Sequence, residues 1–243
     1  WHAMTDGRPR PAYLEIPWDV LSDRGDVNVV PAARVPAPAA LPGKVQEAAQ
    51  LLSRAQRPLI YVGGGVMWSR DTQGVRKLAE RLRAPVATTC NGKGAIPEDH
   101  PLATGYVNFS GPRWRSVWEQ SDVVLAIGTD LGEVATGGWV LPPPRQMVRV
   151  DIDREQLERN YPATIGLAGD AAIVLDQLLE RLPRQEEPTS PSPWAEQVLA
   201  IRSGSCAAVS GSDGLAVVEA MQQALGRTGL SIGDAARVGI WQL

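Results

Sequence analysis

The stretch RPLIYVGGGV, residues 57–66, sets the fold class of this chain. An unbroken apolar run leads straight into the glycines at 63–65, which is typical of a buried parallel strand that enters a tight turn. Apolar residues then recur at helical spacing over 71–83, and Pro85 ends the helical pattern before a second strand at 86–89. This pattern predicts a βαβ unit.

The same alternation of strand and helix continues through residues 43–182. Strands are expected at 59–62, 86–89, 122–127, 147–152 and 165–168, with a loop after Asp99 that contains His100, Pro101 and Gly105. Alternation of this kind favours right-handed crossovers and a parallel sheet. We therefore expect an α/β, Rossmann-like domain with a six-stranded parallel sheet and helices on both faces.

Two proline-rich segments divide the chain. Residues 23–42 and 183–193 are poor in periodic apolar residues and are expected to be linkers. Before the first linker, 13–17 has the pattern of a strand, and the first residue, Trp1, is not methionine, so we expect the chain to begin inside a longer protein. Beyond the second linker, 194–243 begins a further unit with a helix from 194 to 203, a helix capped by Asp213 and a strand at 230–234. Such a unit is too small to be stable alone, so it should pack on the central domain or lack a part.

The composition excludes several classes of protein. With 44% hydrophobic and 21% charged residues, the composition is that of a folded globular protein and not of a disordered one. The net charge of −3 gives no indication of nucleic-acid binding. No apolar run approaches the roughly 18 residues that a membrane span needs. Two cysteines are too few for a disulfide scaffold and have no metal-ligand spacing. We expect a soluble, cytoplasmic protein with reduced thiols and no nucleic-acid or membrane partner.

Residues at the ends of the expected strands are the candidates for binding a nucleotide cofactor. Backbone N–H groups of glycine turns can meet a phosphate, an acid at a strand end can accept bonds from ribose hydroxyls, and a lysine can neutralise a phosphate. The candidate cofactor-binding residues are Gly63, Gly64, Gly65, Lys93, Gly128, Asp151 and Asp153.

Each candidate also has a structural interpretation. Trp68 stands where the fingerprint G-x-G-x-x-G has its third glycine, so the dinucleotide motif is incomplete. Acids such as Asp151 and Asp153 can instead cap the next helix, and a lysine in a glycine-rich loop such as Lys93 can simply be solvated.

Four runs in one order carry a resemblance to a known family. They are PAYLEIPWDV (11–20), PVATTCNGKGAIPEDHPLATG (85–105), SDVVLAIGTDL (121–131) and VDIDREQLERNYPATIGLAGDA (150–171). Together they resemble the thiamine-diphosphate-dependent enzymes of the acetolactate-synthase-like branch. The resemblance implies that residues 1–22 end the pyrimidine-binding domain, 43–182 form the central domain and 194–243 start the pyrophosphate-binding domain.

The resemblance also implies an activity for the full-length protein. It would bind thiamine diphosphate and Mg²⁺ and join or cleave a carbon–carbon bond of a small 2-oxo acid, as a homodimer or homotetramer. The family's catalytic glutamate and its Gly-Asp-Gly and asparagine motif are not present here, so no catalytic or metal-binding residue is assigned. Asp234, which follows Gly233, is not assigned to a metal either. These 243 residues alone are expected to be inactive. The alternative is a non-catalytic α/β nucleotide-binding or scaffolding module.

Some members of this family hold flavin or adenine nucleotide in the central domain. Flavin-binding members have an arginine-phenylalanine-acid run after the strand that ends at Gly128, where this chain has Thr129-Asp130-Leu131. We therefore expect any ligand to be ADP or a coenzyme with an ADP part, and FAD to be the weaker candidate. Its phosphates should lie near residues 63–65 and its ribose near Asp151 and Asp153.

Overall fold

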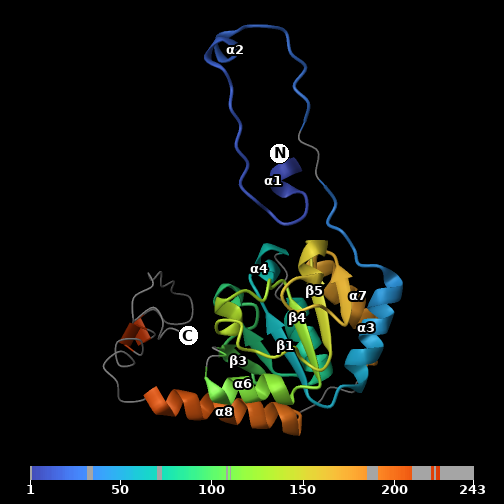
Figure 1. The fold of residues 1–243 in the computed structure, drawn as a ribbon, viewed down its shortest axis with the longest axis vertical. Coiled ribbons are helices and arrows are strands. Elements are labelled where there is room, and N and C mark those ends of the chain that lie inside the picture. The colour runs from blue at the N-terminus through green and yellow to red at the C-terminus, as the bar shows by residue number, and fades with distance from the viewer. Residues whose placement is uncertain are drawn as a thin grey trace.

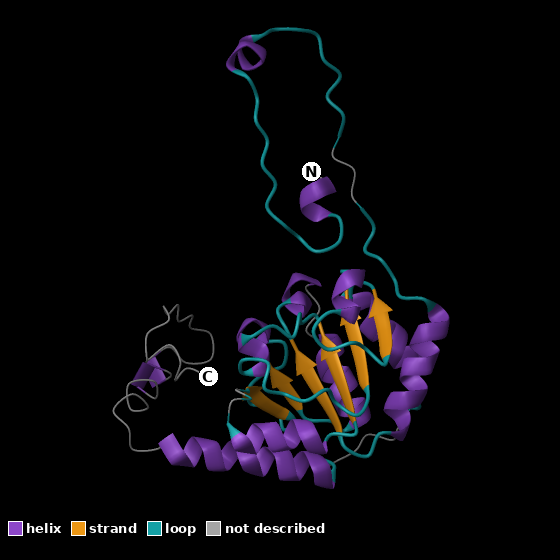
Figure 2. Ribbon diagram, viewed as in Figure 1, coloured by secondary structure: helices purple, strands orange, loops and turns teal. Residues whose placement is uncertain are grey.

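Six parallel strands form the centre of the molecule in a computed structural model, which describes residues 2–31, 35–69, 73–107, 109, 111–184, 191–209, 220, 221, 223 and 224. The strands are β1 (Pro58–Val62), β2 (Val86–Thr88), β3 (Ala103–Tyr106), β4 (Val123–Ile127), β5 (Met147–Asp151) and β6 (Ile165–Ala168). Their order is β3-β2-β1-β4-β5-β6, and every neighbouring pair is parallel (Figures 1 and 2). The predicted six-stranded parallel sheet is confirmed, although only five of its strands were located from the sequence.

The strand order places a switch point between β1 and β4. The chain moves outward from β1 through β2 to β3 and then returns to add β4 on the other side of β1. In open α/β sheets, the crevice for a ligand lies at the carboxyl ends of the strands at such a point.

Helices cover both faces of the sheet, because successive side chains of each buried strand point to opposite faces. Ile60 and Val62 pack in one core cluster with apolar residues of α3 (Pro42–Arg54), α5 (Gln73–Leu82) and α7 (Ala171–Arg181). Leu59 and Tyr61 pack in the other with residues of α6 (Pro112–Gln120) and α8 (Pro193–Val209). The apolar residues that recur at helical spacing in the sequence form the faces that α5 and α7 bury.

Four aromatic residues form the centre of the second cluster. Tyr61, Phe109 and Trp118 contact one another edge to face, and Tyr161 contacts Trp118 in the same way, with ring centroids 5.2 to 6.3 Å apart. The hydroxyl of Tyr61 donates to the carbonyl of Ala135 at 2.7 Å, which satisfies the one polar atom of a fully buried ring. Burial raises the pKa of the Tyr61 hydroxyl, so this donor keeps its proton at neutral pH.

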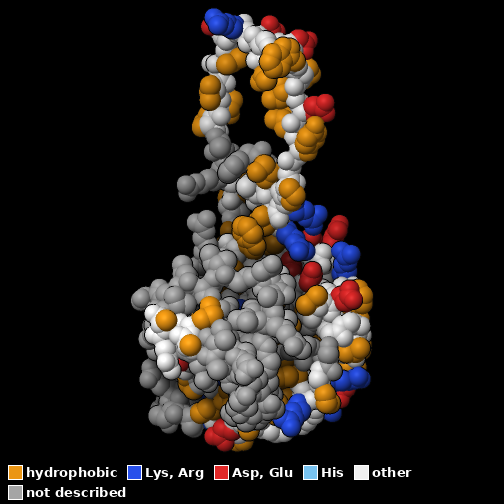
Figure 3. Space-filling model, turned by 90° about the vertical axis from the view of Figure 1, so that its left-hand side faces the viewer, with side chains coloured by type: hydrophobic (Ala, Val, Ile, Leu, Met, Phe, Trp, Pro, Cys, Tyr) orange, Lys and Arg blue, Asp and Glu red, His pale blue; other side chains and the backbone are white. Residues whose placement is uncertain are grey.

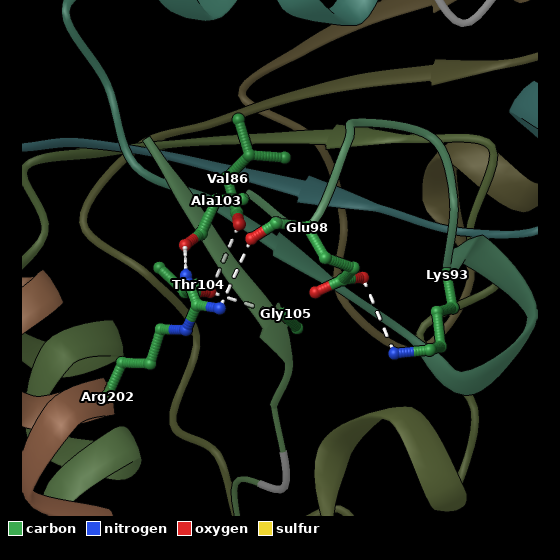
Figure 4. A network of polar contacts seen from close by, with 7 residues as sticks. All are labelled: Val86, Lys93, Glu98, Ala103, Thr104, Gly105 and Arg202. Atoms are coloured by element: carbon green, nitrogen blue, oxygen red, sulfur yellow. Dashed lines mark hydrogen bonds and ion pairs between the residues drawn. The ribbon is translucent and has the colours of Figure 1, made fainter. Parts of the chain in front are cut away.

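The segment expected to be a loop after Asp99 contains the edge strand β3. This strand was missed because ATGY is short, includes a glycine and has no apolar run. Arg202 of α8 holds its start, since the guanidinium donates to the carbonyls of Ala103 at 2.7 Å and of Glu98 at 3.2 Å (Figure 4). A side-chain donor therefore occupies part of the unpaired edge of the sheet.

Helix α8 begins where the sequence predicts a helix, and it packs on the central sheet. Trp194 and Val198 are buried in the second core cluster, and Ala195 is buried in the first. The indole N–H of Trp194 donates to the carbonyl of Pro58 at 2.9 Å, at the start of β1. The helix predicted from Asp213 and the strand at 230–234 lie outside the described residues.

The N-terminal segment differs from its prediction. Residues 13–17 form no strand, and Tyr13 is 87% exposed. A strand needs a neighbouring backbone for its hydrogen bonds, and none of the described residues pairs with this segment. Residues 18–22 are a short helix, α2 (Trp18–Ser22), at the far end of an excursion that carries apolar side chains along its length (Figures 1 and 3).

The end of the first linker is docked on the central domain. Ala40 is buried, and its backbone N–H and carbonyl both bond to the side-chain amide of Gln177 in α7. The N–H of Asp170 donates to the carbonyl of Pro38 at 2.8 Å. None of the described helices has the length and apolar character needed to cross a membrane.

Candidate functional site

A cavity of about 850 Å³ lies along the carboxyl ends of the strands. Residues at or just after the ends of all six strands line it, including Gly63 after β1, Thr89 after β2, Tyr106 in β3, Gly128 after β4, Asp151 in β5 and Gly169 after β6. Its volume falls within the range of small-molecule sites, and it includes the switch point.

The structure brings five of the seven predicted cofactor-binding residues into this cavity. Gly63, Gly64, Gly65, Gly128 and Asp151 line it.

The other two predicted residues do not line the cavity. The ammonium nitrogen of Lys93 lies 3.5 Å from Oε1 of Glu98 (Figure 4). Asp153 forms an ion pair with Arg10 at 2.8 Å, and its Oδ1 accepts the N–H of Glu155 at the start of the 3-10 helix η3 (Arg154–Glu158). The capping interpretation therefore applies to Asp153.

The glycines at the switch point are required by the packing of two turns. The N–H of Gly65 donates to the carbonyl of Gly128 at 2.9 Å, and a Cβ on Gly65 would lie 2.7 Å from the Cα of Gly128. Gly128 itself has a φ of +58°. Of the three glycine N–H groups, those of Gly63 and Gly65 are bonded to carbonyls in the described chain, so only that of Gly64 remains for a phosphate.

Asp151 is the carboxylate best placed to meet a ligand. It ends β5 and is 9% exposed, and its Oδ1 accepts the N–H of Asp153 at 2.9 Å. Burial raises the pKa of this carboxyl, while the backbone N–H and the nearby Arg149 act in the opposite direction. A carboxylate at a strand end can accept hydrogen bonds from ribose hydroxyls.

A buried arginine lies behind the cavity and was not anticipated from the sequence. Arg149 of β5 is 1% exposed, and its guanidinium donates to the carbonyls of Thr129, Arg159 and Tyr161 at 3.1, 2.8 and 2.9 Å. Burial lowers its pKa, and Asp151 is the first of the acids that oppose this shift. The side chain thereby holds the turn after β4 against the loop after η3.

Sequence-distant segments complete the cavity. Residues 5–9 and 35–38 line it, and Arg8 is the one lysine or arginine among the described lining residues. Carboxylates outnumber this cation, the lining acids being Asp6, Asp130, Glu133, Asp151 and Asp170. Three of these acids, Asp130, Asp151 and Asp170, accept backbone N–H groups. No local signal in the sequence identifies Arg8, because it is more than a hundred residues from Asp151.

The described residues contain no cluster of side chains typical of a metal site. Within the part of the chain that the structure describes, no group of three or more His, Cys, Asp or Glu side chains could hold a metal ion. No metal ligand and no catalytic step is therefore assigned to these residues.

Comparisons with known proteins agree with this fold. The family described as "Thiamine pyrophosphate enzyme, central domain" matches residues 45–178, more than half of the chain. A protein of Methanocaldococcus jannaschii described as a probable acetolactate synthase large subunit is 36% identical over 73% of this chain and 32% of its own length. A protein of Pseudomonas aeruginosa described as the probable 2-ketoarginine decarboxylase AruI is 36% identical over 76% of this chain and 33% of its own.

A solved structure shows the same fold. The benzoylformate decarboxylase of Polynucleobacter necessarius superposes with a TM-score of 0.56 and 24% identity, over 69% of this chain and 32% of that one. The chain spans about a third of the length of the curated relatives that it matches. On the match to residues 45–178, the chain belongs to the thiamine pyrophosphate enzyme family and contains its central domain.

Proposed function

We propose that this chain is the central part of a thiamine-diphosphate-dependent enzyme that joins or cleaves a carbon–carbon bond of a small 2-oxo acid. The observation that supports the proposal is the match of residues 45–178 to the family's central domain. The relatives include proteins described as synthases and as a decarboxylase, so both reaction types stay within the proposal. The thiazolium cofactor supplies the chemistry in this class, and the protein supplies binding and orientation.

The test is turnover by the intact protein. With thiamine diphosphate, Mg²⁺ and pyruvate or a larger 2-oxo acid, we expect CO₂ release that depends on the cofactor, with acetolactate or an aldehyde as the second product. Residues 1–243 expressed alone should show no turnover, because the catalytic glutamate and the Gly-Asp-Gly motif implied by the family resemblance are not present in them. Failure of the cofactor-loaded intact protein to consume any 2-oxo acid of a broad panel would contradict the proposal.

We also infer that the cavity at the switch point binds an adenine nucleotide. Its volume, its position and the carboxylate of Asp151 support this inference. Asp151 would accept the ribose hydroxyls, and the N–H of Gly64 and the guanidinium of Arg8 would meet the phosphates. Asp130 lines the same cavity beside the turn after β4, which keeps flavin the weaker candidate because a carboxylate repels an electron-rich ring.

The nucleotide site is tested by titrating ADP into the protein and into Asp151→Asn. Asparagine retains an acceptor for the N–H of Asp153, so the fold should be unchanged, but bonds from ribose to a charged group are lost. We expect an affinity weaker by about tenfold to 150-fold by calorimetry, from the roughly 1.5–3 kcal/mol of a hydrogen bond to a charged group. The matched control is Asp19→Asn, an exposed acid of α2 that does not line the cavity. Equal affinities for all three proteins would place ADP elsewhere.

A further inference from the structure

The turn after β2 contains Asn91, the one asparagine of the sequence that is followed by glycine. It lies in the 3-10 helix η1 (Cys90–Gly92) and is exposed. Asparagine before glycine is the pair most prone to deamidation in an unfolded chain, because glycine has no Cβ to hinder the approach of its backbone nitrogen. The other asparagines, at 28, 108 and 160, precede valine, phenylalanine and tyrosine.

Deamidation of Asn91 needs only water as a co-reactant. The backbone nitrogen of Gly92 loses its proton and attacks Cγ of Asn91, so a new C–N bond forms while the bond from Cγ to the side-chain nitrogen breaks and ammonia leaves. Water then opens the cyclic imide at either of its carbonyl carbons. The product at 91 is aspartate, or isoaspartate, in which the main chain runs through the former side chain.

The N–H of Gly92, whose nitrogen is the nucleophile of this reaction, is held by two acceptors of one residue. It donates to the carbonyl of Thr89 at 3.1 Å and to the hydroxyl of the same residue at 3.1 Å. Thr89 is itself fixed at the end of β1, because its own N–H donates to the carbonyl of Val62 at 2.9 Å. The attack requires a deprotonated nitrogen turned toward Cγ of Asn91, so both bonds to Thr89 must first break.

Glycine is required at 92 by its contact with the end of β1. A Cβ there would lie 2.8 Å from the carbonyl carbon of Val62 and 3.1 Å from the Cα of Gly63. The packing therefore places glycine directly after Asn91, although this creates the reactive pair. Isoaspartate would add a backbone carbon between 91 and 92 and move Gly92 away from β1, so the damage would fall on the packing of the turns after β1 and β2.

We propose that Asn91 is a latent deamidation site and that Thr89 protects it in the folded protein. The hydroxyl of Thr89 keeps the backbone nitrogen of Gly92 protonated and directed into the cap of η1, so the reaction occurs only when this turn opens. Local opening sets the rate of such a reaction, as it does for hydrogen exchange. This protection does not depend on the catalytic reaction or on the nucleotide proposed above.

The test follows deamidation of the full chain and of Thr89→Val at mildly alkaline pH, by mass spectrometry of the peptide that contains Asn91. Valine matches threonine in shape but lacks the acceptor hydroxyl. We expect the folded parent to react at least about tenfold more slowly than the parent unfolded in guanidinium chloride, because the open turn is a minor population. Folded Thr89→Val should react roughly two- to tenfold faster than the folded parent, the range that one hydrogen bond contributes. When unfolded, the two proteins should react equally fast.

Two further variants separate this local effect from a general loss of stability. Thr89→Ser keeps the hydroxyl and should retain the rate of the parent. Thr104→Val removes a buried hydroxyl that donates to the carbonyl of Val86 at 3.0 Å in the neighbouring strand pair. It should destabilise the protein without accelerating the reaction at Asn91.

Three results would overturn the proposal. Asn91 that stays intact in the unfolded chain would show that the pair is not reactive. A folded parent that reacts as fast as the unfolded one would show that the fold gives no protection. If Thr89→Val reacts no faster than the parent, or if Thr104→Val accelerates the reaction equally, the protection does not come from Thr89.

Discussion

Gly128→Ala should lower the free energy of unfolding by about 2–5 kcal/mol and abolish nucleotide binding. The added Cβ would lie 2.8 Å from the Cα of Gly65 and 2.9 Å from the backbone nitrogen of Val66, so backbone would have to move on both sides of the switch point. Such overpacking costs about 1–3 kcal/mol, and a left-handed conformation adds about 1–2 kcal/mol for alanine. Urea unfolding and ADP titration measure the two effects.

Gly138→Ala is the matched control for this substitution. Gly138 has a φ of +87°, but an added Cβ would meet nothing within 4 Å. Alanine there should cost only the backbone term, about 1–2 kcal/mol, and should leave ADP binding intact. Similar losses of stability for the two variants would show that the turns after β1 and β4 are not as tightly interlocked as their geometry indicates.

Arg149→Met should cost about 3–5 kcal/mol of the free energy of unfolding. Methionine is close in length, but it leaves the carbonyls of Thr129, Arg159 and Tyr161 without their donor. Each buried acceptor that loses its partner costs about 1–3 kcal/mol, and the removal of a buried charge offsets part of this sum. Denaturant unfolding of parent and variant gives the difference directly.

Arg145→Met provides the comparison, because Arg145 is an exposed arginine just before β5. Its replacement should change stability by no more than about 0.5 kcal/mol. An Arg149→Met protein as stable as the parent would mean that the three carbonyls find other donors, as happens when some buried charges are replaced by apolar side chains. In that case, the guanidinium would not be what holds the turn after β4.

The central strands were predictable because their signal is local. β1, β4 and β5 are buried on both faces, so each is a continuous apolar run or nearly so, and glycine or acid residues mark where each ends. The edge strand β3 has no such run, and its place in the sheet depends on pairing with β2 and on Arg202. The reverse error occurred at 13–17, where an apolar pattern has no backbone to pair with among the described residues.

The candidate site was predictable only in part, for a similar reason. Strand ends meet at one edge of a parallel sheet, so the positions of Gly63, Gly128 and Asp151 follow from topology. What the glycines contact does not follow, because the crowding arises between two turns whose glycines, Gly65 and Gly128, are 63 residues apart in the chain. Arg8 was missed because the approach of the N-terminal segment to the cavity leaves no pattern in the local sequence. Arg149 was missed because the carbonyls that accept its hydrogen bonds leave none either.

Helix α8 has a consequence for how this protein unfolds. Its indole at 194 caps the start of the central strand, and its guanidinium at 202 holds the edge strand, so the two attachments lie on different strands of the sheet. Releasing the helix would uncover the second core cluster and deprive both strands of a donor. Cooperative units are set by shared contacts of this kind and not by linker composition. The helix should therefore unfold together with the sheet, although the proline-rich segment before it has the composition of a linker between domains.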